Sequence, residues 1–315
     1  MTQRRLGRSD LMIDPLVLGT NVVGWTADEA TSFAVLDAFV DEGFTAIDTA
    51  DVYSRWIDGN DSESEKIIGR WMKARGNRDK VLIFTKVGGD MGPGGKGLGA
   101  KHIEEAVEAS LARLQTDYID LYQSHIFDDG TPQAETLAAY GRLVEAGKVR
   151  VIGASNFDAG QLGEAQGISE SEGLPRYETL QNEYNLYTRE RYEGETQDFC
   201  VENEVSGIPY FGLAAGFLTG KYRLEEHASK SPRGKGVVDK YLNDKGRNIL
   251  AALDAVAAQA GAELGEVALA WLAAQPGIAA PIASATSVEQ VKSLAKGVRL
   301  SLSDDDLKML TEAGK

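Results

Sequence analysis

Four side chains that can donate or stabilise a proton stand at the ends of three successive apolar segments. Asp48 and Tyr53 follow the first segment, Lys86 closes the second and His125 closes the third. An ammonium beside a phenol favours the phenolate and lowers the pKa of the phenol, and a carboxylate compensates for burying that ammonium. The set suits protonation of an oxygen as it becomes an alkoxide. It is not a metal site, and it pairs no serine or cysteine nucleophile with a base.

Protonation of an oxygen leaves open what attacks the carbonyl carbon. No side chain of the set fits that task, so the chemistry implies a hydride from a bound cofactor. Tyr53 would be the general acid, and His125 would orient the substrate oxygen. Taken singly, each residue has a structural interpretation. Asp48 could cap a turn and Tyr53 could be a half-buried ring. Lys86 could be a solvated strand end and His125 a core histidine. Their joint placement after successive strands favours the functional interpretation.

The elements that must position these residues alternate between strand and helix patterns. The expected strands are 16–19, a segment ending at 48, 81–86, 119–125, 149–155, 179–183, 207–211 and 280–283. The expected helices are one from the capping box Thr26-x-x-Glu29 to Gly43, then 64–75, 101–114, 133–146, 159–170, 193–203, 247–260 and 264–274, and two that begin at the caps Ser287 and Ser303. Eight such units favour an α/β fold, a (β/α)8 TIM barrel with extra C-terminal helices.

The barrel interpretation treats residues 1–315 as a single domain. Segments 4–6 and 11–13 flank a turn and predict an N-terminal β-hairpin that plugs the bottom of the barrel. Functional side chains in such barrels follow the carboxyl ends of the strands. The four proton-handling residues all do so.

The composition narrows the possible partners. A net charge of −15 argues against binding to nucleic acid or to an anionic membrane. No apolar stretch approaches the roughly 18 residues of a membrane span, and the start lacks the apolar core of a secretory signal. Cys200 is the only cysteine, which suits a reducing compartment. We therefore expect a cytoplasmic protein. The proton-handling residues indicate a small carbonyl or alcohol as its substrate. We expect the protein to be a monomer or a small homo-oligomer.

A cofactor site is expected at the later strands rather than at the glycine-rich segment 92–97. That segment matches G-x-G-x-x-G, but it does not join a strand directly to a helix as a dinucleotide fingerprint should. Loops after late barrel strands and helix N-termini are better phosphate sites. The candidates are Ser155, Asn156 and Gln181 for a carboxamide, Tyr210 for ring stacking, the loop residues Phe211, Gly212, Leu213, Gly216, Leu218, Gly220 and Lys221, the cap residues Ser284, Ala285, Thr286 and Gln290, and Gly19, Thr20, Asn21 and Asp48 on the early strands.

Over nearly its whole length the chain resembles the aldo-keto reductase superfamily, in the bacterial branch that is also similar to potassium-channel β subunits. The matching segments are 43–53, 64–69, 84–86, 120–125, 147–157, 181–186 and 216–222. The resemblance implies a TIM barrel that binds NADP(H) in an extended pose. It also implies Tyr53 as general acid/base, with Asp48, Lys86 and His125 completing the tetrad.

Two departures from that pattern bear on the cofactor. Phe211-Gly212 stands where many relatives have Ser-Pro, and Ser284 and Gln290 stand where many carry Lys or Arg. Without a cationic clamp at those positions, NAD(H) becomes a possible cofactor beside NADP(H).

The substrate is less well defined than the cofactor. Trp25 and Trp56 are expected to form an apolar or aromatic wall of its pocket, although both could serve packing alone. The leading hypothesis is an NAD(P)H-dependent reductase of aldehydes and ketones. The alternative is a cofactor-binding, redox-sensing regulatory subunit. A metal-dependent hydrolase is disfavoured, because the three histidines include no H-x-H pair.

Overall fold

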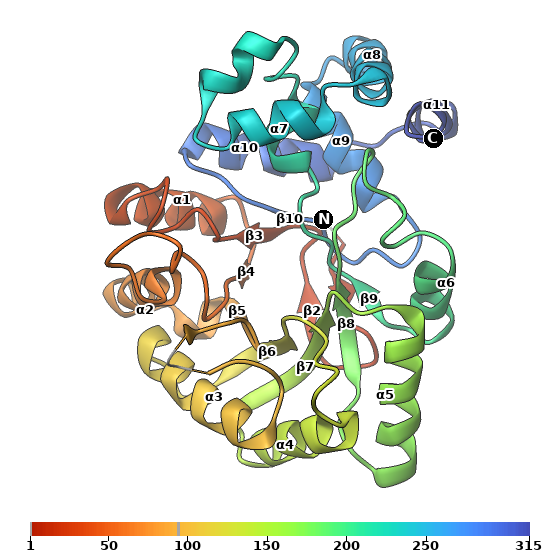
Figure 1. Ribbon diagram of the computed structural model, residues 1–315. Helices are drawn as coiled ribbons and strands as arrows, with labels where there is room; N and C mark the ends of the chain where they lie inside the picture. The colour runs from red at the N-terminus through yellow and green to blue at the C-terminus, as the bar shows by residue number, and fades with distance from the viewer. Residues whose placement is uncertain (1, 93–94) are drawn as a thin grey trace.

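A closed parallel barrel forms the centre of the molecule (Figure 1). The computed structural model describes residues 2–92 and 95–315. The strands, in sheet order, are β10 (Ile282–Ala283), β3 (Val17–Gly19), β4 (Ala46–Asp48), β5 (Leu82–Val87), β6 (Ile119–Ser124), β7 (Val149–Ser155), β8 (Tyr177–Gln181) and β9 (Ser206–Gly207). The Gly207 main chain bonds to Gly277 and Ala279 just before β10, at 2.8 Å each, and thereby closes the sheet. The predicted barrel is confirmed.

Helices surround the barrel and follow the predicted alternation (Figure 1). They are α1 (Glu29–Asp41), α2 (Glu63–Arg75), α3 (Ala100–Leu114), α4 (Gln133–Glu145), α5 (Ala159–Glu172), α6 (Glu195–Glu202), α7 (Gly234–Tyr241), α8 (Asp244–Ala260), α9 (Leu264–Ala273), α10 (Val288–Arg299) and α11 (Asp304–Ala313). Short 3-10 helices occur at η1 (Arg78–Lys80), η3 (Ala214–Thr219) and η4 (Glu225–Lys230).

Apart from shifts of up to three residues at the ends of elements, the structure differs from the predicted strands and α-helices at three places. The N-cap of α1 is Asp28, whose carboxylate accepts from the Thr31 N–H, and not Thr26, which lies in the preceding turn. The predicted strand 207–211 is present only as β9, followed by an isolated bridge between Tyr210 and Glu183, and the left-handed φ of 55° at Phe211 ends the extended segment. Helix α7 was not predicted, although its buried Val237, Val238 and Tyr241 recur at helical spacing, because Gly234 and Gly236 disfavour a helix.

The predicted N-terminal hairpin is present as β1 (Arg4–Arg5) paired antiparallel with β2 (Met12–Ile13). Its fully or nearly fully buried Leu6, Leu11 and Ile13 belong to one apolar cluster with inward strand residues such as Phe84 and Leu121. Burial of this cluster closes one end of the barrel interior. The carboxyl ends of the strands are left to form a site at the other end.

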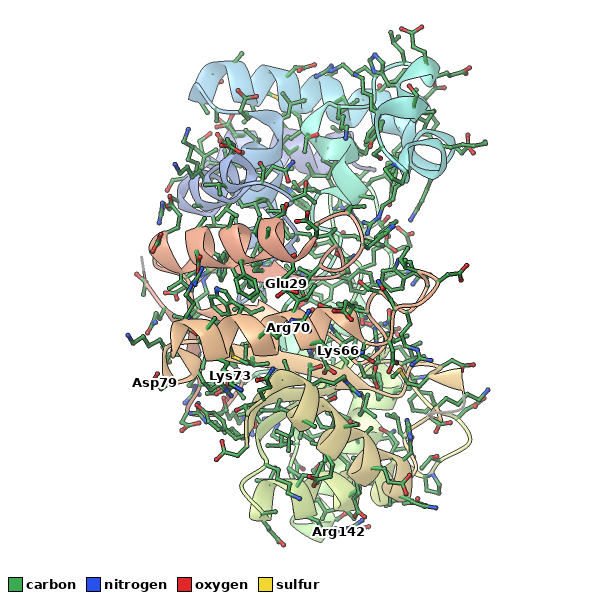
Figure 2. All side chains as sticks on the ribbon, turned by 90° about the vertical axis from the view of Figure 1, so that its left-hand side faces the viewer. Glu29, Lys66, Arg70, Lys73, Asp79 and Arg142 are labelled. Carbon is green, nitrogen blue, oxygen red and sulfur yellow. The ribbon has the colours of Figure 1, made fainter. Side chains whose placement is uncertain are left out.

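Ion pairs join neighbouring helices on the outer surface shown in Figure 2. Arg70 on α2 binds Glu29 on α1 at 2.8 Å, and Arg142 on α4 binds Glu104 on α3 at 2.7 Å. These side chains are substantially exposed, and such pairs each stabilise a fold by only about 0–1 kcal/mol. The position of α2 therefore depends mainly on packing.

Helices α2 and α3 approach each other closely at Gly69. A Cβ atom added at Gly69 would lie 2.3 Å from the Arg113 carbonyl oxygen, a backbone atom that cannot swing aside. This close approach also lets Glu65 of α2 bind Arg113 of α3, with 2.6 Å between Oε2 and Nε.

Gly69→Ala should lower the free energy of unfolding by about 1–3 kcal/mol, because the new methyl group forces the two helices apart. The matched control is Gly167→Ala in α5, where an added Cβ meets nothing within 4 Å. The control should raise the free energy of unfolding by about 0.5–1 kcal/mol. Urea denaturation measures both, and equal effects of the two substitutions would contradict the packing argument.

Candidate active site

A cavity of about 890 Å³ opens at the carboxyl ends of the strands. The predicted residues that line it are Gly19, Asn21, Asp48, Tyr53, Trp56, His125, Ser155, Asn156, Gln181, Tyr210, Phe211, Gly212, Leu213, Gly216, Lys221, Ser284, Thr286 and Gln290. These positions come from segments more than 250 residues apart in the chain. The fold thus gathers most of the predicted site residues around one space.

The other predicted site residues lie beside the cavity and do not line it. Lys86 is fully buried beneath Tyr53, and Trp25 packs edge-on against Trp56 with ring centroids 5.6 Å apart. The Thr20 hydroxyl donates to the Asp48 carbonyl at 2.8 Å. Leu218, Gly220 and Ala285 also fall outside the lining, where Leu218 and Ala285 are buried in the core and Gly220 packs against side chains of Arg223 and Leu264.

The Lys86 ammonium is the centre of the proton-handling residues. Its Nζ donates to Asp48 Oδ2 at 2.7 Å, to the Thr49 carbonyl at 2.6 Å and to the Tyr53 hydroxyl at 3.2 Å. An ammonium has three N–H donors, so this buried group is fully satisfied. The tertiary structure therefore brings Asp48, Tyr53 and Lys86 into direct contact.

Asp48 is also bound by two glutamines. Its Oδ1 accepts from Gln123 Nε2 at 3.2 Å and from Gln181 Nε2 at 2.9 Å. We did not predict a role for Gln123. The signal was available, because Gln123 lies between Leu121 and His125 in the period-2 alternation that faces the barrel interior, where a polar side chain needs a partner.

Burial has the largest single influence on the pKa values of Tyr53, Lys86 and His125. Burial raises the pKa of the Tyr53 phenol, and the Lys86 charge opposes this rise without cancelling it. The ammonium thus acts in the predicted direction but is outweighed. Burial alone would lower the pKa of Lys86, but Asp48 and Tyr53 more than compensate, and the net change is upward. Lys86 is therefore charged over the whole neutral range.

His125 is a neutral imidazole at neutral pH. Burial lowers its pKa to about 3, and the nearby Lys86 charge acts in the same direction. Its ring lies edge-on to Tyr53, with centroids 6.1 Å apart. Asn156 Nδ2 donates to the His125 carbonyl at 3.0 Å and so fixes the main chain at that point. A neutral imidazole can donate one N–H to a substrate oxygen.

The residues predicted to hold a carboxamide form a second hydrogen-bonded group. Ser155 Oγ donates to the Gln181 carbonyl at 2.7 Å, and the Tyr210 hydroxyl donates to Asn156 Oδ1 at 2.9 Å. Asn156 has a left-handed φ of 59°, which asparagine tolerates better than most residues. Because Gln181 also binds Asp48, this group is continuous with the proton-handling residues.

The cavity lining also includes an irregular loop and several basic side chains. Phe211, Ala214 and Ala215 all have left-handed φ values, between 47° and 55°. Such conformations make concave arrays of N–H groups that suit anions. Two basic residues that we did not predict, Lys230 and Arg233, line the same cavity with Lys221. They come from a basic stretch, 230–235, whose proximity to the cavity had no signal in the sequence.

The N-terminal cap of α10 is partly as predicted. Ser287 caps α10 and accepts from the Gln290 N–H at 3.3 Å. The Gln290 side chain accepts from the Thr286 N–H at 2.8 Å, and Ser284 Oγ donates to Asn21 at 2.9 Å. The Arg233 guanidinium lies 4.3 Å from the Trp25 ring centroid, and Trp25 packs in turn against Trp56 beside Tyr53.

The described residues also bear on metal binding and on membrane-spanning helices. Within 2–92 and 95–315, no group of three or more His, Cys, Asp or Glu side chains could hold a metal ion. In the same described ranges, every helix is too short or too polar to cross a membrane.

Lys86→Met should lower the free energy of unfolding by about 3–5 kcal/mol, because it leaves the buried Asp48 carboxylate without its counter-charge. The double variant Lys86→Met/Asp48→Asn should lose less stability than Lys86→Met alone. Both are measured by urea denaturation against the wild type. A double variant no more stable than the single one would show that charge pairing is not what holds this site.

Known proteins resemble this chain over nearly its whole length. The Aldo/keto reductase family model matches residues 15–315. An uncharacterized oxidoreductase of Bacillus subtilis, YrpG, is 34% identical over 98% of this chain and 94% of its own length. The aldo-keto reductase AMT2 of Alternaria alternata is 32% identical over 99% and 91%, respectively. A probable voltage-gated potassium channel subunit beta of Arabidopsis thaliana is 31% identical over 95% and 91%. The chain therefore belongs to the aldo/keto reductase family.

Proposed function

We propose that the protein reduces aldehyde or ketone carbonyls to alcohols with NAD(P)H, and that Tyr53 is the general acid. The observation that carries this proposal is the position of the Lys86 ammonium, which donates to both Asp48 and Tyr53 at the wall of the large cavity. A buried, charged donor bonded to a phenol is an arrangement that stabilises the phenolate left after proton transfer.

The residues divide the reaction between them. The nicotinamide cofactor, when bound, supplies the hydride. Tyr53 donates its hydroxyl proton to the carbonyl oxygen, and Lys86 stabilises the resulting phenolate through its existing hydrogen bond. Neutral His125 donates a hydrogen bond to the same oxygen and so orients it. In the oxidation of an alcohol, Tyr53 takes the proton back.

The cavity fits an extended dinucleotide in both size and chemistry. Ser155, Asn156 and Gln181 present hydroxyl and amide groups for the carboxamide at the end near Tyr53. Lys221 and Lys230 present cations on the same lining, whereas Arg233 lies over Trp25 on the side of Trp56 and Tyr53. Cations are the natural partners of a phosphate. They supply what Ser284 and Gln290 lack, so we propose NADP(H) as the preferred cofactor.

The substrate side of the cavity favours flat apolar carbonyl compounds. Trp56 is half exposed and lies edge-on to Tyr53, with ring centroids 6.3 Å apart, and Trp25 backs it. Aromatic rings prefer such edge-to-face or offset arrangements. We propose aromatic aldehydes as the first substrates to test.

A second candidate function is cofactor-dependent regulation of a partner protein. The similarity to a probable potassium channel subunit beta of Arabidopsis thaliana is the observation that favours it. Steady turnover of an aromatic aldehyde by the wild-type protein would decide for the reductase. Tight cofactor binding without any turnover would decide for the regulatory subunit.

Tyr53→Phe should lower kcat by about 10²–10⁴-fold, because it removes the proton donor and little else. The dissociation constant for NADPH, measured by protein fluorescence, should change less than about twofold, since the hydroxyl contributes no charge to the phosphate end. The control is Tyr118→Phe, at the distant Arg78 contact. Wild-type kcat in Tyr53→Phe would eliminate the proposed role of Tyr53.

Lys221→Met and Lys230→Met should each raise KM for NADPH by about tenfold, the loss expected for one charge-assisted contact of about 1.4 kcal/mol. KM for NADH should change much less, because NADH lacks the 2′-phosphate. Arg223→Met is the matched control, since Arg223 binds Asp254 at 2.7 Å and does not line the cavity. Equal losses for both cofactors would place these cations elsewhere than at the 2′-phosphate.

A further inference from the structure

Asp51 is a buried acid for which the proposed mechanism has no use. It lies two residues before Tyr53 and is 1% exposed. Neither of its carboxyl oxygens has a hydrogen-bond partner within the described part of the chain. It does not line the cavity, so it touches neither substrate nor cofactor. Its main-chain N–H donates to the Lys86 carbonyl at 3.4 Å, which ties it to the strand of the catalytic lysine.

The cation that acts most strongly on Asp51 is already bound elsewhere. Arg113 binds Glu65 at 2.6 Å and also contacts Ser110. Glu65 is fully buried and accepts a second hydrogen bond, from the Thr85 hydroxyl at 2.6 Å. Two buried carboxyl groups thus face one guanidinium, and Glu65 holds it. Asp51 would be an uncompensated buried charge if it were ionised, which is costly.

The charged and titratable groups around Asp51 act in opposite directions. They are Glu65 on α2, Arg113 on α3, Lys86 on β5, Tyr53 on its own loop, Tyr122 on β6 and Tyr140 on α4. Burial raises the pKa of Asp51 to about 7, and Glu65 adds to the rise, while Arg113, the nearby Val52 N–H and Lys86 oppose it. An ionised Asp51 in turn raises the pKa of Tyr53.

We propose that Asp51 holds a proton behind the catalytic lysine and is a positioning residue that sets the pH range over which Tyr53 is an effective acid. This inference rests on the proposed reductase function. While Asp51 is neutral, Lys86 is the main charge that opposes the effect of burial on Tyr53, and proton donation to a carbonyl is favoured. When Asp51 ionises, Tyr53 becomes a weaker acid and its phenolate a stronger base, so alcohol oxidation is favoured.

The kinetic test is the pH profile of kcat for aldehyde reduction by the wild type, by Asp51→Asn and by Asp14→Asn. The control residue, Asp14, is a buried carboxylate bonded to Thr45 and Gln3 beside the N-terminal hairpin. Wild type and Asp14→Asn should lose kcat across an inflection near pH 7. Asp51→Asn should lack that inflection, with KM little changed. Persistence of the inflection in Asp51→Asn would overturn the proposal.

A stability test separates this inference from the proposed function. The folded-state pKa of Asp51 is above its ordinary value, so its protonated form stabilises the fold at low pH, and that contribution is lost as the pH rises through about 7. The urea midpoint of the wild type should therefore fall relative to that of Asp51→Asn between about pH 5 and about pH 8. A constant difference between the two proteins would overturn the proposal, whether or not the wild type reduces aldehydes.

A third measurement uses only the wild-type protein. Infrared spectra of the wild type should show the carbonyl band of a protonated carboxyl group at about pH 6 that disappears by about pH 8. The reductase proposal fails separately, if the wild type binds NADPH but turns over no aldehyde. Absence of the infrared band at the lower pH would show that Asp51 is ionised there and would refute the inference.

Discussion

The buried ammonium of Lys86 is the interaction on which the rest of the site depends. A charge with no exposure to water is tolerable only if every N–H finds an acceptor. Asp48, Thr49 and Tyr53 supply those acceptors, and each must be held at hydrogen-bond distance. Parallel pairing of β4 with β5 brings Asp48 opposite Phe84, two residues before Lys86. The register of the barrel therefore sets the geometry of the proposed proton transfer.

Asp48 carries this constraint across the barrel. One of its oxygens binds Lys86, and the other binds Gln123 and Gln181. Gln181 lies among the residues proposed to hold the cofactor carboxamide. The Asp48 carboxylate thus links Tyr53, the proposed proton donor, to Gln181, a proposed cofactor contact, with Lys86 between Asp48 and Tyr53. This is a physical reason why a substitution at one end of the network would affect both proton transfer and cofactor orientation.

Two buried acids, Asp48 at the end of β4 and Asp51 in the loop after it, differ in their charge partners. Asp48 is paired with a cation, whereas Asp51, three residues later, faces Glu65 and Arg113, and its carboxyl group has no ion-pair partner among the residues that the structure describes. The close approach of α2 to α3 at Gly69 holds Glu65 and Arg113 together. Helix packing outside the barrel in this way determines the charge that Asp51 can carry. Packing and electrostatics are coupled here through a few buried groups.

The sequence by itself determined the barrel and most of the candidate site, because strand and helix periodicities are local and barrel strands present their carboxyl ends at one rim. Asp48, Tyr53, Lys86 and His125 could be found from that rule. The same rule does not reveal the role of Gln123, the presence of Lys230 and Arg233 at the cavity, or the buried charge environment of Asp51. Those features were decided only by the tertiary structure, since each depends on which distant groups share a buried space, and hydrogen bonding and desolvation act between neighbours in space.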